Sequence, residues 1–146
     1  AVDSKIVMHE QCHFLTSYCK ELVMDLDQMV ACIGSIDVQI VDARPHKRFE
    51  GLVPEPREGV RSGKIPSSVN LFYGDLIGED KTLKPTQDLK KIVKSHGINL
   101  DKHIVASCGS GVTAAILYIV FKGLGARRVS VYDGSWCEWG SIDDLV

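Results

Sequence analysis

One cysteine lies between two apolar segments, and only small or uncharged residues follow it directly. The stretch IVASCGSGVTAAIL, residues 104–117, contains Cys108 followed by Gly109, Ser110 and Gly111. The glycines allow the backbone to curl around the sulfur, so that successive N–H groups can face an anion. A thiol in that position is expected to ionise readily, and the thiolate is the nucleophilic form. The pattern favours a reactive cysteine over a buried, inert one.

Two reactions suit a cysteine in such a loop. A phosphatase of the Cys-x5-Arg type needs a guanidinium six residues after the cysteine to hold the phosphoryl oxygens, but that position is Ala114. The other reaction is sulfur transfer, in which the thiolate takes the outer sulfur of a donor and passes it on from a persulfide. Because the persulfide is also an anion, the same amides can stabilise it. The residues therefore favour sulfur transfer.

A cationic segment precedes this loop in the chain. Residues 44–64 hold six Lys and Arg against three Glu, although the formal net charge of the whole chain is −2. Guanidinium forks bind a carboxylate in a geometry that lysine cannot copy. The segment is rich in Pro and Gly and lacks periodicity, so we expect a long loop, and such loops are usually functional. A solvated charged loop without a ligand is the alternative.

Apolar runs separated by turn residues indicate the elements that position these groups. We expect strands over 37–44, 68–72, 103–107 and 128–134. We expect helices over 22–33, 89–96 and 113–124, the last buried because it is apolar on nearly every face, and a closing turn or helix over 135–140. Strands separated by helices imply a parallel sheet covered on both faces. Cys108 would then lie at the carboxyl edge of the sheet, where such proteins bind ligands.

Length and composition set the limits of the prediction. The 146 residues suit one domain, with 45% hydrophobic and 25% charged residues. The pI of about 6.2 argues against binding to nucleic acid or a membrane surface. The longest apolar run, Val112 to Phe121, is too short to cross a bilayer. We expect a lead-in or interdomain linker over residues 1–21 and the domain proper over 22–146.

The cysteines point to a reducing compartment. There are five, an odd number, without a Cys-x-x-Cys pair, which is a poor disulfide framework. His9, Cys12, His13 and Cys19 have no standard zinc-ligand spacing, so a polar linker with incidental histidines is favoured there. We expect neither a metal nor an organic cofactor.

Three separated segments resemble the rhodanese family, most closely the C-terminal catalytic domains of mercaptopyruvate sulfurtransferases. They are VDARPHKRFEGLVPEPREGVRSGKIPSSVN at 41–70, CGSGVT at 108–113 and VSVYDGSWCEWG at 129–140. Thiosulfate-using rhodaneses generally carry basic residues in the loop after the cysteine. Ser67 departs from the pattern, because glycine is usual there. The resemblance implies an α/β rhodanese-like domain with a central parallel sheet of about five strands and helices on both faces.

The resemblance also implies roles for individual residues. Arg48 and Arg57 match the arginines that hold the carboxylate and carbonyl of the substrate, while Arg44 and Arg61 are weaker candidates for the same pocket. The Ser110 hydroxyl is expected to assist proton transfer near the sulfur. The remaining expectations concern the loop and its support: Gly109, Gly111, Val112 and Thr113 line the site, Thr113 can also cap the helix, Asp133 and Ser135 brace the loop, Trp136 and Trp139 are core, and Cys137 lies apart from Cys108.

The function implied is transfer of sulfur from 3-mercaptopyruvate through a persulfide on Cys108. Pyruvate is released, and a thiol, a thioredoxin-like protein or cyanide accepts the sulfur. Such enzymes carry an N-terminal rhodanese-like domain that closes over the site, so this domain is an expected partner in the same polypeptide, in the cytoplasm or mitochondrion. Two alternatives remain open: a thiosulfate sulfurtransferase using the same cysteine, and a non-catalytic rhodanese-like binding module.

Overall fold

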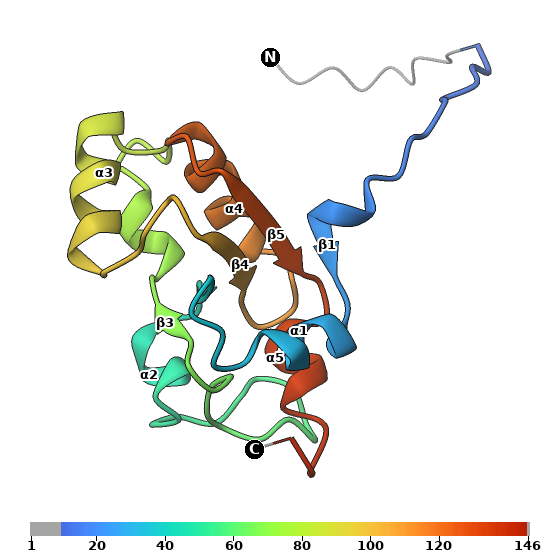
Figure 1. The fold of residues 1–146 in the computed structure, drawn as a ribbon, viewed down its shortest axis with the longest axis vertical. Helices are drawn as coiled ribbons and strands as arrows, with labels where there is room; N and C mark the ends of the chain where they lie inside the picture. Colours follow the sequence, from blue (N-terminus) through green and yellow to red (C-terminus); the bar gives the residue numbers. More distant parts are fainter. Residues whose placement is uncertain (1–9, 146) are drawn as a thin grey trace, which may run out of the picture.

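A five-stranded, all-parallel sheet lies at the centre of the computed structural model, which describes residues 10–145 (Figure 1). The strands follow one another across the sheet in the order β1 (Val23–Met24), β5 (Arg128–Tyr132), β4 (His103–Ser107), β2 (Val38–Asp42) and β3 (Val69–Asn70). The predicted α/β fold, with a central parallel sheet of about five strands, is confirmed.

The strand order changes direction beside β2, and this determines where a ligand can bind. From β2 the chain runs to β3 on one side, and then crosses to β4 on the other side of β2. Asp42 pairs with Ser107 at the carboxyl ends of the two strands. The segments that leave β2 and β4 therefore diverge at one edge, where open parallel sheets form their binding crevices. Arg44 and Cys108 lie in these two segments.

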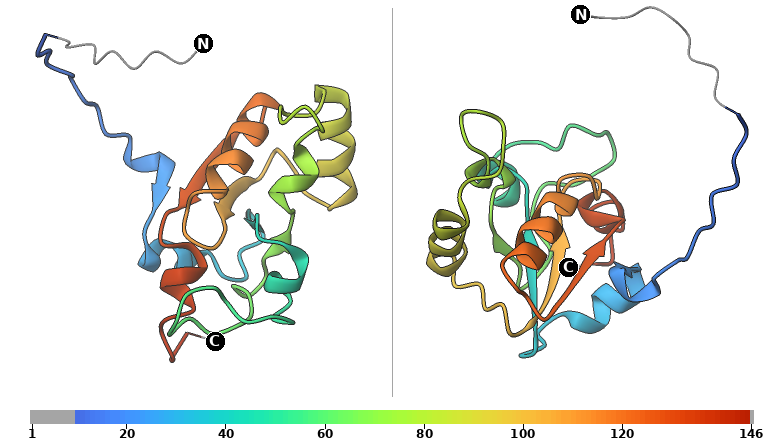
Figure 2. Two further views of the ribbon diagram at one scale, coloured as in Figure 1. Left: turned by 180° about the vertical axis from the view of Figure 1, so that it is seen from behind. Right: turned by 90° about the horizontal axis from the view of Figure 1, so that it is seen from above.

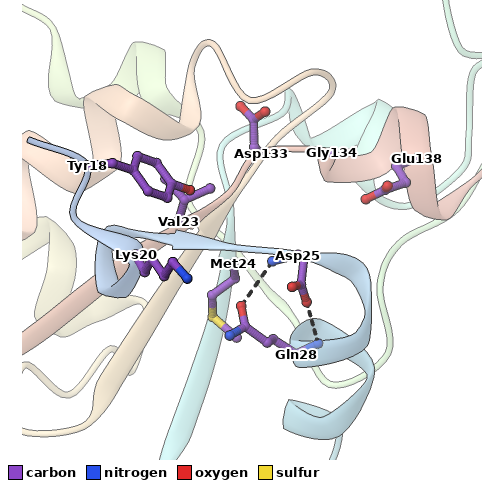
Figure 3. A pocket seen from close by; sticks show the side chains of 9 residues that line it. All are labelled: Tyr18, Lys20, Val23, Met24, Asp25, Gln28, Asp133, Gly134 and Glu138. Carbon is purple, nitrogen blue, oxygen red and sulfur yellow. Dashed lines mark hydrogen bonds between the residues drawn. The ribbon is translucent and has the colours of Figure 1, made fainter. Parts of the chain in front are cut away.

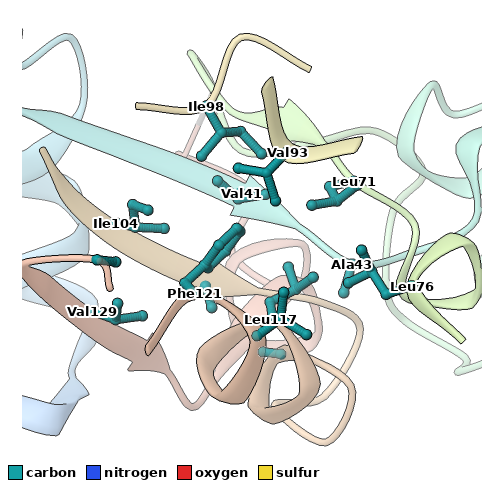
Figure 4. Packing of buried hydrophobic residues seen from close by; sticks show 14 of the residues in the cluster. Val41, Ala43, Leu71, Leu76, Val93, Ile98, Ile104, Leu117, Phe121 and Val129 are labelled. Carbon is teal, nitrogen blue, oxygen red and sulfur yellow. The ribbon is translucent and has the colours of Figure 1, made fainter. Parts of the chain in front are cut away.

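Helices cover both faces of the sheet because alternate strand residues point to opposite sides. Val41 and Ile104 face one side, where they pack with Leu117 and Phe121 of α4 (Ala114–Gly123) and with α3 (Thr86–Ser95) (Figure 4). The neighbouring positions, Ile40 and Val105, face the other side. There they pack with Met29 of α1 (Leu26–Cys32) and with Trp136 and Trp139 of α5 (Ser135–Trp139). Both tryptophans are core residues, as predicted.

The N-terminal part of the domain differs from the helix expected over residues 22–33. A short 3-10 helix, η1 (Lys20–Leu22), leads into β1, and α1 begins only at Leu26. Asp25 sets this start, because its carboxylate accepts the Gln28 N–H at 2.9 Å while the Gln28 side chain accepts the Asp25 N–H at 3.1 Å. Residues 10–19 form no helix or strand and run away from the domain (Figure 2).

Other boundaries also differ from the sequence-based expectations. The expected long loop contains α2 (His46–Phe49), and η2 (Tyr73–Leu76) follows β3. The helix over 113–124, expected to be buried, is buried along one face by Leu117 and Phe121, whereas Ile119 on another face is 59% exposed. Ser67 has a φ of 60° in the left-handed region, a conformation in which glycine carries no steric cost. Between residues 10 and 145, none of the helices combines the length and the apolar character needed to cross a bilayer.

Candidate active site

The loop that carries Cys108 is attached at both ends to one serine. β4 ends at Ser107, and the Cys108 side chain is buried, with 1% of the residue exposed. The Ser135 oxygen accepts hydrogen bonds from the N–H groups of Cys108 and Gly111, each at 3.1 Å, and lies 4.0 Å from the Cys108 sulfur. The Ser135 hydroxyl donates to the Tyr132 carbonyl at 2.8 Å. The expectation that Ser135 braces the loop agrees with this geometry.

The first turn of α5 binds the loop from the same side. The N–H groups of Trp136 and Cys137 donate to the carbonyls of Cys108 and Gly109, at 2.9 and 2.8 Å. Four other loop amides, by contrast, donate to no protein group among residues 10–145. They belong to Gly109, Ser110, Val112 and Thr113. These N–H groups are available to an anion bound at the loop.

Glycine is required at two loop positions for different steric reasons. Gly111 has a φ of +80°, and a Cβ there would lie 2.7 Å from the Asp133 carbonyl oxygen. Gly109 does not have a left-handed φ, but a Cβ would lie 2.9 Å from Nη2 of Arg48. Gly111 thus permits the turn itself, whereas Gly109 lets a guanidinium rest against the loop.

A pocket of about 350 Å³ opens beside the loop and collects most of the predicted site residues. It is lined by Arg44, Pro45, Arg48, Glu55, Pro56, Arg57, Tyr73, Cys108, Gly109, Ser110, Val112, Thr113 and Cys137. Of the residues expected at the site, Gly111 and Arg61 do not border this pocket; Gly111 is buried beside Ser135. Thr113 borders the pocket, but the prediction that it caps α4 is wrong, because its side chain makes no capping hydrogen bond.

Arg48 forms an ion pair inside this pocket. Its Nη2 and Nε donate to the Glu55 carboxylate, whose side chain is only 1% exposed, compared with 26% for Arg48. The hydrogen bond to Glu55 is the main cause that raises the pKa of Arg48 above its usual value. Nη1 of Arg48 donates to no group within the described residues, so this arginine keeps donors for a ligand.

Arg44 also borders the pocket, but its guanidinium is fully engaged. It is 1% exposed, donates to Asp42 at 2.8 Å and to Glu55 at 2.9 Å, and reaches the Gly63 carbonyl at 2.9 Å. It also lies over the Trp136 ring, 4.8 Å from the centroid. These contacts indicate a structural role that fixes Glu55 beneath Arg48.

Arg61 lies away from the pocket, whereas Arg57 borders it. Arg61 donates to the carbonyls of Ile142 and Leu145 and does not border the pocket, so its candidacy for the site is wrong. Arg57 is exposed, borders the pocket and forms no ion pair with any described residue. Because Asp42 and Glu55 balance Arg44 and Arg48 in charge, Arg57 brings an uncompensated positive charge to the site.

The position of Cys137 also differs from the expectation. It was expected apart from Cys108, yet it borders the same pocket, because the first turn of α5 binds the Cys108 loop. Tyr73, from η2, and Glu55 complete the lining without having been expected there. Glu55, close in sequence to Arg48 and Arg57, could have indicated a partner for an arginine of this segment.

A second cavity, of about 440 Å³, lies near β1 and α5 and includes Asp25, Asp133 and Glu138 in its lining (Figure 3). Glu138 accepts a hydrogen bond from the Tyr132 hydroxyl at 2.6 Å, and burial together with this carboxylate raises the pKa of Tyr132 far above its usual value. Its described lining contains no cysteine, so the larger cavity is separate from the nucleophile.

Residues 10–145 contain no group of three or more His, Cys, Asp or Glu suited to a metal; His9 lies outside the described residues.

Comparison with known proteins places this geometry in a family. The model of the rhodanese-like domain matches residues 25–142. "Thiosulfate/3-mercaptopyruvate sulfurtransferase 1, mitochondrial" of Arabidopsis thaliana is 44% identical over 132 residues, which are 90% of this chain and 35% of that protein. The 3-mercaptopyruvate sulfurtransferase of Escherichia coli K12 is 39% identical over 90% of this chain and 47% of that protein. The chain thus spans less than half the length of these relatives.

Solved structures agree with the fold. Tum1 of Saccharomyces cerevisiae has a TM-score of 0.74 and 34% identity, over 82% of this chain and 43% of that one. A variant of EanB in complex with ergothioneine, described as containing a cysteine persulfide, has a TM-score of 0.80 and 25% identity over 86% of this chain and 31% of that one.

Proposed function

The chain belongs to the family of rhodanese-like domains, and from this we propose that it takes sulfur from 3-mercaptopyruvate as a persulfide on Cys108. One observation carries the proposal: a buried cysteine, loop amides and one arginine, Arg57, surround one pocket, and neither the amides nor Arg57 have a partner among residues 10–145. The amides suit an anionic sulfur, and the arginine suits the carboxylate of the donor.

In the first step the Cys108 thiolate attacks the sulfur of 3-mercaptopyruvate. A sulfur–sulfur bond forms, and the carbon–sulfur bond breaks with its electron pair moving into the enolate of pyruvate. The thiol proton of the donor stays on the outer sulfur, and the enolate takes a proton to become pyruvate. The Ser110 hydroxyl, at the edge of the pocket, is suited to pass that proton. The product is a persulfide on Cys108.

Arg57 and the free Nη1 of Arg48 are the groups that hold the carboxylate and carbonyl of the donor. The charge balance favours a donor with one negative charge, because Arg57 alone is uncompensated. Thiosulfate carries two negative charges and would benefit from further cations beside Cys108. Thiosulfate transfer remains the second candidate, because the printed name of the Arabidopsis relative includes that donor.

The amides of Gly109, Ser110, Val112 and Thr113 provide hydrogen bonds for the thiolate and for the persulfide that replaces it. A small thiol, a thioredoxin-like protein or cyanide then removes the outer sulfur. The reaction uses no metal or organic cofactor in any of these steps.

A neighbouring domain completes the site in this proposal. Val112 is 74% exposed at the pocket and Leu52 is 70% exposed in the segment that follows α2, which leaves apolar surface for another domain to cover. The greater length of the relatives supports a further domain. We propose that it is an N-terminal rhodanese-like domain of the same polypeptide, joined through residues 1–21 to the domain over 22–146. Cytoplasm and mitochondrion are the compartments we propose, the latter named for one relative.

A donor comparison tests the function. We expect 3-mercaptopyruvate to add the mass of one sulfur atom to the intact protein and to release pyruvate, and we expect Cys108→Ser to abolish both. Cys32→Ser, in α1, is the matched control and should behave as the unaltered protein. Preferential use of thiosulfate would replace the proposed donor. No gain of sulfur from either donor, with the neighbouring domain present, would favour a binding module.

A further inference from the structure

Cys137 borders the same pocket as Cys108, and the mechanism above gives it no role. Its position is fixed by the backbone, because its N–H donates to the Gly109 carbonyl at 2.8 Å and the N–H of Trp136 donates to the Cys108 carbonyl at 2.9 Å. Both cysteines are free thiols. The β4–α4 loop and the first turn of α5 therefore hold two sulfur nucleophiles on the walls of one pocket.

The two thiols differ in their access to solvent. Cys108 is 1% exposed, whereas Cys137 is partly exposed. Because Cys108 borders the pocket and is otherwise buried, the pocket is the space into which an added sulfur atom can extend, and Cys137 borders the same space. The other described cysteines are elsewhere: Cys12 and Cys19 precede the domain, and Cys32 borders a different cavity. Cys137 is thus the described thiol best placed to meet that sulfur.

Arg48 provides a positive charge close to Cys137. The two side chains border one pocket, and Cys137 is the smallest of the causes that raise the pKa of Arg48, after Glu55 and Asp42. The sulfur species exchanged in this pocket are anions, for which the Arg48 guanidinium is a counterion. Arg48 lies against Gly109 as well, so it faces both sulfur-bearing segments.

We propose that Cys137 is an internal sulfur acceptor, which takes the outer sulfur from Cys108 and presents it to the final acceptor. The step rests on the proposed function, which supplies the Cys108 persulfide. The Cys137 thiolate attacks the outer sulfur, and a new sulfur–sulfur bond forms at Cys137. The bond to Cys108 breaks, and its electron pair returns Cys108 to the thiolate. The proton of the outer sulfur stays with that sulfur, so no oxidant or reductant is consumed.

The burial of Cys108 selects the outer sulfur as the point of attack. Thiolates attack a sulfur–sulfur bond in line with the leaving sulfur. Attack on the inner sulfur would need an approach from the packed side of the loop, opposite the pocket. Attack on the outer sulfur comes from the pocket side, where Cys137 lies, and its leaving group is the Cys108 thiolate that the loop amides stabilise.

Peptide mapping after exposure to 3-mercaptopyruvate tests the relay. The intact polypeptide is treated without reductant, alkylated, and digested with trypsin. Cys108 then lies in peptide 103–122 and Cys137 in the peptide that begins at Val129, so the added sulfur can be assigned to either residue. We expect the sulfur first on Cys108 and then on Cys137. In Cys108→Ser the sulfur on Cys137 should fall at least roughly tenfold, because the donor is attacked only by the loop thiolate.

Cys137→Ser provides the complementary measurement. We expect this variant to gain sulfur on Cys108 as fast as the unaltered protein and to keep it there, while Cys32→Ser shows the unaltered distribution. Sulfur confined to Cys108 in the unaltered protein would overturn the relay, and so would equal labelling of Cys137 in Cys108→Ser. Release of hydrogen sulfide with a Cys108–Cys137 disulfide would overturn it too, because the inner sulfur would then be the target. Sulfur on neither cysteine would contradict the proposed function, and the relay with it.

Discussion

The side-chain oxygen of Ser135 lies 3.1 Å from the backbone nitrogen of Cys108 and accepts its hydrogen bond. The same oxygen accepts the N–H of Gly111, and the hydroxyl proton goes to the Tyr132 carbonyl. Ser135 has a φ of 52°, a left-handed conformation that is costly for a residue with a side chain. A strained residue with every hydrogen-bonding position used is the anchor of the loop.

Ser135→Ala should therefore destabilise the fold and disorganise the site together. Two buried N–H groups would lose their acceptor, at a cost of about 1–3 kcal/mol each. Urea unfolding should show a total loss of about 2–6 kcal/mol for the two groups, and sulfur uptake by Cys108 should slow under conditions where the variant is folded. Ser95→Ala removes an exposed hydroxyl that donates to a helix carbonyl, and it should change neither property. A variant as stable and as active as the unaltered protein would show that Ser135 does not anchor the loop.

Arg57 should act on donor binding alone. It is exposed and without an ion pair among the described residues, so Arg57→Ala should leave unfolding unchanged. The loss of a charged hydrogen bond worth about 1.5–3 kcal/mol predicts a KM for 3-mercaptopyruvate raised roughly 10- to 100-fold. Arg57→Lys should recover only part of this loss, because lysine lacks the planar fork. Arg127→Ala, also exposed, is the control in steady-state kinetics, and an unchanged KM in Arg57→Ala would exclude the assigned role.

Glu55 connects the stability of the pocket to its charge. Its buried carboxylate receives both Arg44 and Arg48, so Glu55→Gln leaves one positive charge without a counterion. Removing one partner of a buried pair costs about 3–5 kcal/mol. Under conditions where the Glu55→Gln variant is folded, its ratio of activity with thiosulfate, which is doubly charged, to activity with 3-mercaptopyruvate should be higher than that of the unaltered protein. Glu50→Gln, from a half-exposed pair with Lys64, should change neither the unfolding free energy nor the donor ratio.

The fold was accessible from the sequence because its signals are local. β2 and β4 are short segments rich in apolar residues, and a short polar break after each defines the carboxyl edge of the sheet. β1 was missed because a two-residue strand has no periodicity of its own and depends on pairing with β5. The capping box at Asp25 and Gln28 was present in the sequence and would have corrected the start of α1.

The site was harder to predict from the sequence than the fold, because its charged residues are paired by contacts that the order of residues does not show. Arg44, Arg48, Arg57 and Arg61 look alike in a cationic segment, and only packing separates them. Glu55 lies under Arg48, and the C-terminal carbonyls capture Arg61. Cys137 likewise reaches the pocket through contacts between residues that are far apart in the chain, which spacing alone does not encode.

His103 should make the stability depend on pH. Its Nε2 donates to Ser130 Oγ at 2.9 Å, because the Ser130 hydroxyl itself donates to the Glu21 carbonyl. Burial and then the charge of Arg128 hold the pKa of His103 below its usual value of 6.5. The unfolded imidazole therefore binds a proton first as the pH falls below about 6.5, and the free energy of unfolding decreases there.

The free energy of unfolding in urea, measured in about five buffers between pH 7.5 and pH 5, tests this pH dependence. His103→Gln, which cannot take the proton, should show a smaller loss of stability over that interval. His46→Gln, in α2, should follow the unaltered protein. Equal pH dependence in all three proteins would contradict the assignment to His103.

The two loop glycines should respond differently to the same added methyl group. Gly111→Ala places a Cβ 2.7 Å from a backbone carbonyl oxygen, at a φ of +80°. Neither this steric clash nor the strained φ can be relieved without moving the loop. We expect the free energy of unfolding of this variant to fall by about 1–3 kcal/mol, and we expect the variant to lose sulfur uptake. Gly109→Ala places a Cβ 2.9 Å from the end of the Arg48 side chain, which can shift. We expect this variant to unfold as the unaltered protein does, but with a higher KM, because Arg48 is displaced from the loop. Calorimetry and kinetics on both variants separate the roles, and equal stability losses would show that Gly109 is also required for the turn.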